Sequence, residues 1–209
     1  MFDLDADERR VLGTLIEKQL ATPQYYPLTL SALVQACNQS TSRDPVTNYS
    51  ESDVRSTLQR LKDKELIRTV LPSHGRSVDR YGHRLNEHVT LIQEEIALLG
   101  VLMLRGPQTE AELKSRTERL APWEAPDTPA SVLDRLVHKP EPLARNIGRG
   151  RGRHDRWVDL LGDIEPTFTE PVVTSGRGAP KSDDRLGDLE ARVAKLEAEI
   201  AELREQLGG

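Results

Sequence analysis

The sequence predicts a mainly α-helical fold with small β-hairpins (α+β), arranged as two tandem winged-helix domains and a C-terminal coiled-coil helix. Three observations support this prediction. Three amphipathic helices and a β-hairpin are indicated within residues 1–88, the same order of elements recurs within residues 89–162, and a heptad pattern occupies residues 185–207. Three helices followed by a hairpin form the helix-turn-helix variant in which the hairpin is called the wing.

In the first domain, each helix is predicted from a capping residue that precedes apolar side chains at helical spacing. The first helix shows a capping box, because Asp5 is followed three residues later by Glu8. The second helix is expected to end near Cys37. Two short strands are expected at residues 67–71 and 77–85, around a turn at residues 73–76. The three expected N-caps are Asp5, Thr29 and Ser50.

The second domain repeats this order without obvious sequence identity. Its first helix is expected at residues 91–104, and the apolar run 96–104 within it is too short to cross a bilayer because a span needs about 20 apolar residues. Thr109 opens a capping box, and Thr128 is an N-cap followed by a proline at the first helical position. A second hairpin is expected from strands at residues 143–147 and 156–161, with the GRGRGR stretch between them.

Beyond residue 162 the composition changes. Residues 163–184 contain prolines and glycines and few large apolar side chains, so a flexible linker is expected. Residues 185–207 have apolar side chains at alternating spacings of three and four, which favours a parallel homodimer. The alternative is a single amphipathic helix that folds back onto the body. The expected dimer contacts are Leu186, Leu189, Val193, Leu196, Ile200, Leu203 and Leu207.

The charge and cysteine content restrict the classes of function. The chain carries 34 acidic and 29 basic residues, so its formal net charge of −5 argues against indiscriminate nucleic-acid binding. One cysteine permits no intrachain disulfide, which suits a reducing cytosol. The acidic N-terminus shows no secretory signal. A cytoplasmic protein with no membrane association is therefore expected.

Arginines gather in the two expected wings despite the acidic balance. Alternation with glycine lets the backbone turn and approach a ligand closely, so such a wing suits the phosphate backbone or minor groove of DNA. The alternatives are a solvated hairpin tip or a surface for an acidic protein partner. The candidate nucleic-acid contacts are Arg76 and Arg80 in the first wing and Arg149, Arg151, Arg153 and Arg156 in the second.

The third helix of each domain argues against reading of the major groove. The N-terminal part of a recognition helix usually meets the base edges, but in the first domain it offers Glu51 and Asp53, and in the second Asp127 and Asp134. These carboxylates would repel phosphates, although Arg55, Gln59 and Arg60 of the first domain could still reach out. Contact led by the wings is therefore the expected mode if DNA is bound.

No set of residues indicates an enzyme. No sequence signature places a base beside Cys37, so its expected role is that of a small apolar residue at the end of the second helix, with Asn38 and Gln39 bonding the following loop. The five histidines show no paired metal spacing, and the GRGRGR stretch lacks the helix N-terminus of a phosphate loop. No catalytic residue, cofactor or metal is therefore expected.

The stretch from Ile16, IEKQLATPQYYPLTLSALVQACNQSTSRDPV, resembles the YceH-like family of uncharacterised bacterial proteins. The resemblance covers roughly Leu4–Leu161 and implies two tandem winged-helix domains, but no established activity. The linker and the C-terminal helix lie outside it. The matching features are Glu17-Lys18-Gln19, Thr22-Pro23, Tyr26-Pro27-Leu28, Ala36-Cys37-Asn38-Gln39 and Arg43-Asp44-Pro45-Val46.

These observations together predict a non-enzymatic, DNA-binding regulatory protein that dimerises through its C-terminal helix. The alternative is an adaptor that uses tandem winged helices as protein-binding surfaces, since fold does not fix function. The acidic third helices favour this alternative.

Overall fold

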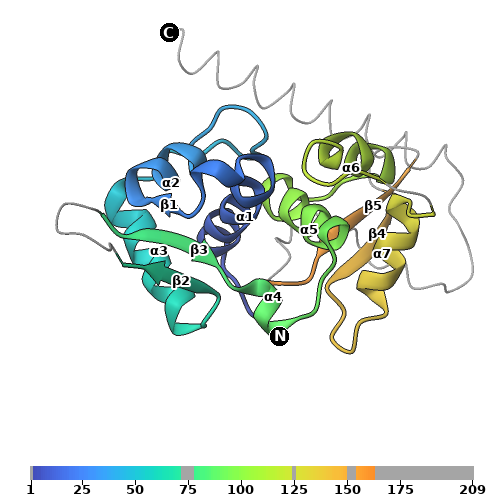
Figure 1. Ribbon diagram of the computed structural model, residues 1–209. Coiled ribbons are helices and arrows are strands. Elements are labelled where there is room, and N and C mark those ends of the chain that lie inside the picture. Colours follow the sequence, from blue (N-terminus) through green and yellow to red (C-terminus); the bar gives the residue numbers. More distant parts are fainter. Residues whose placement is uncertain (1, 72–77, 124–125, 150–153, 163–209) are drawn as a thin grey trace, which may run out of the picture. The chain divides into compact units, whose positions relative to one another are not determined.

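The computed structural model describes residues 2–71, 78–123, 126–149 and 154–162 (Figure 1). These residues form helices and small antiparallel sheets, which confirms the predicted mixture of helix and strand. The helices are α1 (Ala6–Ala21), α2 (Leu30–Cys37), α3 (Glu51–Asp63), α4 (Leu85–His88), α5 (Gln93–Arg105), α6 (Glu110–Thr117) and α7 (Pro129–Val137), with a 3₁₀ turn at Pro23–Tyr25. The strands are β1 (Leu28–Thr29), β2 (Ile67–Val70), β3 (Arg80–His83), β4 (Ala144–Arg149) and β5 (Asp155–Asp159).

The predicted helix starts are confirmed by the caps. The Asp5 carboxylate accepts a hydrogen bond from the Glu8 backbone N–H at 2.8 Å, and the Glu8 side chain accepts one from the Asp5 N–H at 2.9 Å. Reciprocal bonds of this kind satisfy two backbone donors that a helix start leaves unpaired. The other predicted N-caps, Thr29, Ser50, Thr109 and Thr128, each accept a bond from the N–H three residues on.

The first sheet has three strands in the order β1-β3-β2, all antiparallel. The strand β1 was not predicted from the sequence, and its two residues pair with Tyr81 and Arg80 of β3. The expected strand 77–85 was too long, since β3 covers Arg80–His83 and Leu85 begins the short helix α4. Leu85 is fully buried, so the residues after β3 form a helical turn that packs into the core instead of continuing the strand.

The second sheet contains β4 and β5, and its register shifts between Asn146 and Arg149. The GRGRGR stretch does not lie wholly between the strands as expected, because Gly148 and Arg149 belong to β4. Gly148 has a φ of +77°, a left-handed conformation that glycine adopts without strain. Gln108 exchanges two backbone hydrogen bonds with Trp157 of β5, at 3.0 and 2.8 Å, so the loop before α6 forms a bridge on this hairpin.

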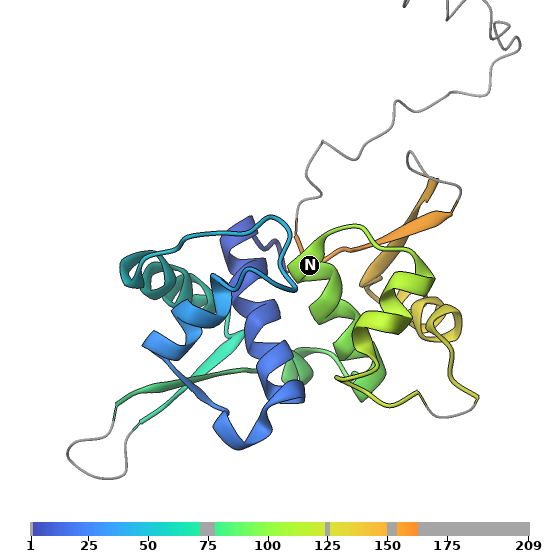
Figure 2. The same cartoon turned by 90° about the horizontal axis from the view of Figure 1, so that it is seen from above.

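The helices α1 and α5 cross at two glycines. A Cβ on Gly100 would lie 2.9 Å from Ile16, and one on Gly13 would lie 3.1 Å from both Met103 and Leu104. The absence of these side chains lets the two backbones approach, and the apolar side chains around the crossing form one continuous core. The β2–β3 and β4–β5 hairpins lie on opposite sides of this helix pair (Figure 2).

The loop between α2 and α3 is held by buried polar groups. Arg43 bonds Glu17 through two guanidinium nitrogens, at 3.1 and 2.7 Å, and also donates to the Ala36 carbonyl. The Asn38 amide oxygen accepts from the Tyr49 N–H at 2.7 Å, as expected of a residue that bonds this loop. Cys37 is fully buried, and burial raises the pKa of its thiol, which suits the expected structural role.

Candidate nucleic-acid interface

Three of the six predicted nucleic-acid contacts are described by the structure, namely Arg80, Arg149 and Arg156. The other three, Arg76, Arg151 and Arg153, lie outside the described residues. The same holds for the predicted linker and for all seven predicted dimer contacts, Leu186, Leu189, Val193, Leu196, Ile200, Leu203 and Leu207.

Arg149 is much more accessible than Arg156, whose side chain is 37% exposed. It is the last residue of β4, and its side chain is 76% exposed. Its Nε lies 3.6 Å from a carboxylate oxygen of Asp155, which is itself half exposed. An exposed pair at this separation contributes little free energy, typically about 0–1 kcal/mol. The guanidinium is therefore available to a phosphate at small cost.

Arg156 lies one residue inside β5 and is turned toward the body. Its Nη1 donates to the Pro107 carbonyl at 2.8 Å and lies 3.7 Å from a carboxylate oxygen of Glu112. These contacts hold β5 against the start of α6. Binding of a phosphate by Arg156 would compete with both, so of the described wing arginines Arg149 has the stronger case.

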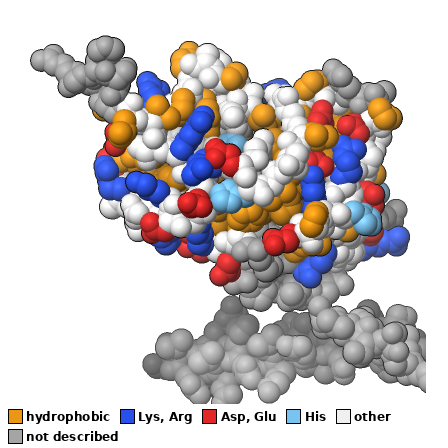
Figure 3. Space-filling model, turned by 60° about the horizontal axis from the view of Figure 1, so that its bottom comes forward, with side chains coloured by type: hydrophobic (Ala, Val, Ile, Leu, Met, Phe, Trp, Pro, Cys, Tyr) orange, Lys and Arg blue, Asp and Glu red, His pale blue; other side chains and the backbone are white. Residues whose placement is uncertain are grey.

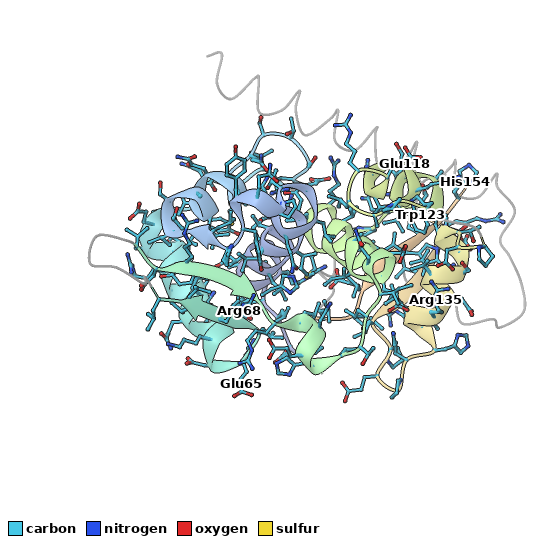
Figure 4. The ribbon with its side chains drawn as sticks, viewed as in Figure 1. Glu65, Arg68, Glu118, Trp123, Arg135 and His154 are labelled. Atoms are coloured by element: carbon cyan, nitrogen blue, oxygen red, sulfur yellow. The ribbon has the colours of Figure 1, made fainter. Side chains whose placement is uncertain are left out.

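On the first hairpin, register places Arg68 and Arg80 on one face of the sheet. Arg68 pairs with Gly82 and Val70 pairs with Arg80, and directly paired residues point to the same side. Arg80 and Arg68 are exposed, and Arg80 donates to the Pro27 carbonyl at 3.0 Å. Figure 4 shows Arg68 on β2 and His154 beside the start of β5.

Each third helix carries one arginine that is already paired, whereas Arg55 and Lys62 of α3 are exposed and form no ion pair among the described residues. In α3, Arg60 lies 3.2 Å from Asp5 and 3.7 Å from Asp7, across the interface with α1. In α7, Arg135 donates to Asp127 at 2.8 Å (Figure 4). Asp53 accepts bonds from Ser50 and is thus a capping residue. These pairings agree with the sequence-based argument against major-groove reading.

The surface drawn in Figure 3 mixes the two signs of charge. Basic and acidic side chains lie next to one another, with apolar side chains between them. No broad basic field covers this face among the described residues, so a contact with DNA would have to be local. The exposed apolar side chains of the first hairpin are Val70, Leu71 and Val78, at 40%, 73% and 59% exposure.

Comparison with known proteins identifies the family. The model of the family described as "Protein of unknown function, DUF480" matches residues 4–153. The chain belongs to this family. The YceH-like resemblance seen in the sequence refers to the same family, and the DUF480 match begins just before α1 and ends beyond β4.

Relatives of this DUF480 protein extend the similarity beyond the described residues. UPF0502 proteins of Pseudomonas syringae pv. tomato, Mesorhizobium japonicum and Chromobacterium violaceum are 40%, 41% and 42% identical to it. The matches cover 96%, 96% and 99% of this chain and 91%, 92% and 93% of the relatives. The Chromobacterium relative therefore also matches the segment with the heptad pattern.

The described part of the chain shows neither a metal-binding cluster nor a helix that could cross a membrane. No group of three or more His, Cys, Asp or Glu side chains there is arranged to hold a metal ion. Among the helices described, none has the length and apolar character that a membrane crossing requires.

Proposed function

We propose that this protein is a non-enzymatic, cytoplasmic DNA-binding regulator built from two winged-helix domains, which contacts DNA mainly through its hairpin wings. Three helices and a hairpin occur in the order α1, α2, α3, β2 and β3, with β1 completing the sheet. The order recurs as α5, α6, α7, β4 and β5, with Gln108 bridging to β5 much as β1 pairs with β3. This repetition supports the winged-helix assignment.

The observation that carries the proposal is the exposure of Arg149 at the point where β4 leads into the Gly-Arg-Gly-Arg stretch. Residues 145–156 contain five arginines and one aspartate, a local excess of positive charge in an acidic chain. Cationic side chains gain affinity for DNA by releasing counterions from the phosphates. A basic hairpin apex is suited to this contact, and the acidic first turn of α3, with Glu51 and Asp53, favours the wing over that helix.

The second part of the proposal is a parallel homodimer through residues 185–207. In a parallel pair, all three flanking charge pairs join opposite signs, namely Arg185–Glu190, Arg192–Glu197 and Glu199–Arg204. Two linked copies raise the effective concentration of one wing once the other is bound. Weak contacts from single wings are thereby strengthened.

Fluorescence anisotropy with a mixed-sequence duplex, between about 50 and 200 mM salt, tests the wing. Replacing Arg149, Arg151 and Arg153 by Ala together is expected to weaken binding at least tenfold. The slope of log K against log salt should fall by about 2–3, since each lost phosphate contact removes about 0.9. Lys114→Ala, an exposed change on α6, is the control and should leave both values unchanged. Retained affinity in the triple variant would contradict the proposal.

The second candidate function is a protein-binding adaptor. It is favoured by the paired cations of the third helices and by the exposed apolar side chains Val70, Leu71 and Val78 on the first hairpin. A pull-down that recovers a partner in nuclease-treated extract, and that loses it with Leu71→Asp but not with the triple arginine variant, would favour the adaptor. If the partner is lost only with the triple arginine variant, the contact surface is the second wing and not the apolar side chains of the first hairpin.

A further inference from the structure

A pocket of about 150 Å³ lies where α1, α5 and α6 meet, away from both hairpins. Glu17 and Ala21 of α1 line one side, together with Ser42 of the loop between α2 and α3, and residues of α5, of α6 and of the segment just after α6 line the rest. The pocket therefore joins the two repeats of the fold. Its volume is close to that of an engineered protein cavity that binds benzene, and a bulk water takes about 30 Å³.

Three arginines surround the pocket: Arg105 at the end of α5, Arg116 in α6 and Arg119 just after α6. Within the described part of the chain, neither Arg105 nor Arg119 forms an ion pair or a side-chain hydrogen bond. Arg116 has one contact, at 3.4 Å to Glu112. The pocket therefore holds more cationic groups than the surrounding carboxylates neutralise.

The acidic residue of the pocket does not balance this excess. Both carboxylate oxygens of Glu17 accept bonds from the buried Arg43, and Lys18 lies 3.5 Å away. Burial lowers the pKa of Arg105, and the positive charges of Arg116 and Arg43 lower it further, while Glu17 and Asp44 act in the opposite direction. A bound anion would relieve this repulsion among like charges.

The remaining wall is apolar. Val101, Leu104 and Leu120 contribute aliphatic surface. Gly100 also lines the pocket but has no side chain, and a Cβ at this position would lie 2.9 Å from Ile16. Three arginine residues and an aliphatic wall therefore line one pocket about the size of a small ring. A ligand that fits both has a charged end and an apolar body.

We propose that this pocket binds a small organic carboxylate, whose acid group pairs with Arg105 and Arg119 and whose apolar body lies against Val101, Leu104 and Leu120. A guanidinium and a carboxylate match in geometry and form short, charge-assisted bonds. Because residues of α1, of α5 and of α6 with the segment after it form the pocket wall, a ligand that fills the pocket stabilises the contact between the two repeats. This site is independent of DNA binding by the wings, so it is tested separately.

Inorganic phosphate and the DNA backbone fit the pocket less well than an organic acid. Either would pair with the arginines but would leave the aliphatic wall facing water, which forgoes about 25 cal/mol for each Å² of apolar surface. The test must therefore separate an organic acid from an anion alone and from a nucleic acid.

Isothermal titration calorimetry of the full chain with sodium benzoate provides this test. Saturable binding is expected, with a dissociation constant of about 1 mM or below. Benzamide, which has the same ring without the charge, and inorganic phosphate, which has the charge without the ring, should each bind at least tenfold more weakly. Absence of saturable benzoate binding, or equal binding of phosphate, would overturn the proposal.

Two variants locate the binding. The double change Arg105→Gln with Arg119→Gln removes the charges, and Ala21→Leu, at an exposed helix position on the rim, reduces the space. Each should weaken benzoate binding at least tenfold, whereas Arg55→Gln on α3 should leave it unchanged. Thermal unfolding of each variant checks that it folds. If the double arginine variant does not fold, Ala21→Leu still tests the pocket. Unchanged benzoate binding in a folded variant would overturn the proposal. So would a variant that loses binding to duplex DNA while it keeps its binding to benzoate.

Discussion

Arg9 of α1 forms an ion pair with Asp159 of β5, which joins the first helix of the first repeat to the last strand of the second. The residues are 150 positions apart in sequence. Asp159 is 1% exposed at its side chain and Arg9 is 15% exposed, so the pair is shielded from water. The link explains how a strand at the end of the second repeat is fixed to the start of the chain.

Asp159→Asn is expected to lower the free energy of unfolding by about 3 kcal/mol. Removing one partner of a buried pair leaves an uncompensated charge, which typically costs about 3–5 kcal/mol. Urea denaturation followed by circular dichroism measures the change. Asp155→Asn, in the same strand but paired with Arg149 at the surface, is the matched control and should change the value by less than about 0.5 kcal/mol. Equal effects from the two changes would show that the Arg9 pair is no more important than a surface contact.

Gly162→Ala is expected to destabilise the protein by about 1–3 kcal/mol, because it overfills a packed contact. A Cβ at this position would lie 1.9 Å from the Leu4 carbonyl oxygen, so backbone must move. The Leu4 N–H donates to the Leu161 carbonyl at 2.9 Å, and this bond would be strained by the shift. The control Ser115→Ala, exposed on α6, should stay within about 0.5 kcal/mol. A thermal unfolding midpoint equal to that of the wild type would contradict the close packing of Leu4 on Gly162.

His83 is expected to make the protein less stable as the pH falls from 6.5 toward 4. Burial first, and the charge of Arg68 second, lower the pKa of His83 to about 4. The unfolded chain takes up a proton near pH 6.5, as a free histidine does, and the folded chain does not until about pH 4. The unfolded state therefore binds more protons in this window, and the loss reaches about 3 kcal/mol at its lower end.

Urea denaturation at pH 6.5 and pH 4.5 compares the wild type with His83→Gln. The variant should lose much less stability over this interval, because the group that takes up the proton is gone. His138→Gln is the control, since that side chain is 72% exposed. A variant with the same pH dependence as the wild type would mean that His83 does not resist protonation in the folded protein.

Leu196→Lys is expected to convert the proposed dimer to a monomer. Leu196 is a central d position of the heptad pattern, and a lysine there would place two like charges in the seam. Size-exclusion chromatography with light scattering measures the mass over a range of concentrations. Ala198→Lys is the matched control, because it adds the same side chain outside the a and d positions, and it should leave the mass unchanged. A wild-type mass equal to 23.4 kDa at every concentration would contradict the dimer.

The local features were predictable because their chemistry is local. Asp5, Ser50, Thr109 and Thr128 bond backbone groups three residues away, so a short stretch of sequence contains the whole interaction. The apolar stripes of α1 and α5 are also visible in a short stretch of sequence, because their side chains recur every three or four residues. The predicted boundaries of α5 and of several strands were shifted from the observed ones, because helix ends and strand ends respond to neighbours.

The strand β1 was not predictable from its own residues. Leu28 and Thr29 form a strand only because β3 pairs with them, and two residues are too few for an alternating pattern. The Gln108–Trp157 bridge was missed for the same reason. The pocket at α1, α5 and α6 also has no sequence signal, since Glu17, Arg105 and Arg119 meet only after the repeats pack.

The sequence by itself determined where α1, α2, α3, α6 and α7 begin, that the order of elements repeats, and that arginines concentrate in the second hairpin. Only the tertiary structure decided what each arginine does: Arg149 faces solvent, Arg156 bonds Pro107, Arg60 and Arg135 pair with carboxylates, and Arg105 lines a pocket. The physical reason is that helix capping and periodicity act over three or four residues, whereas the energy of a charge depends on every group that folding brings within a few ångströms of it.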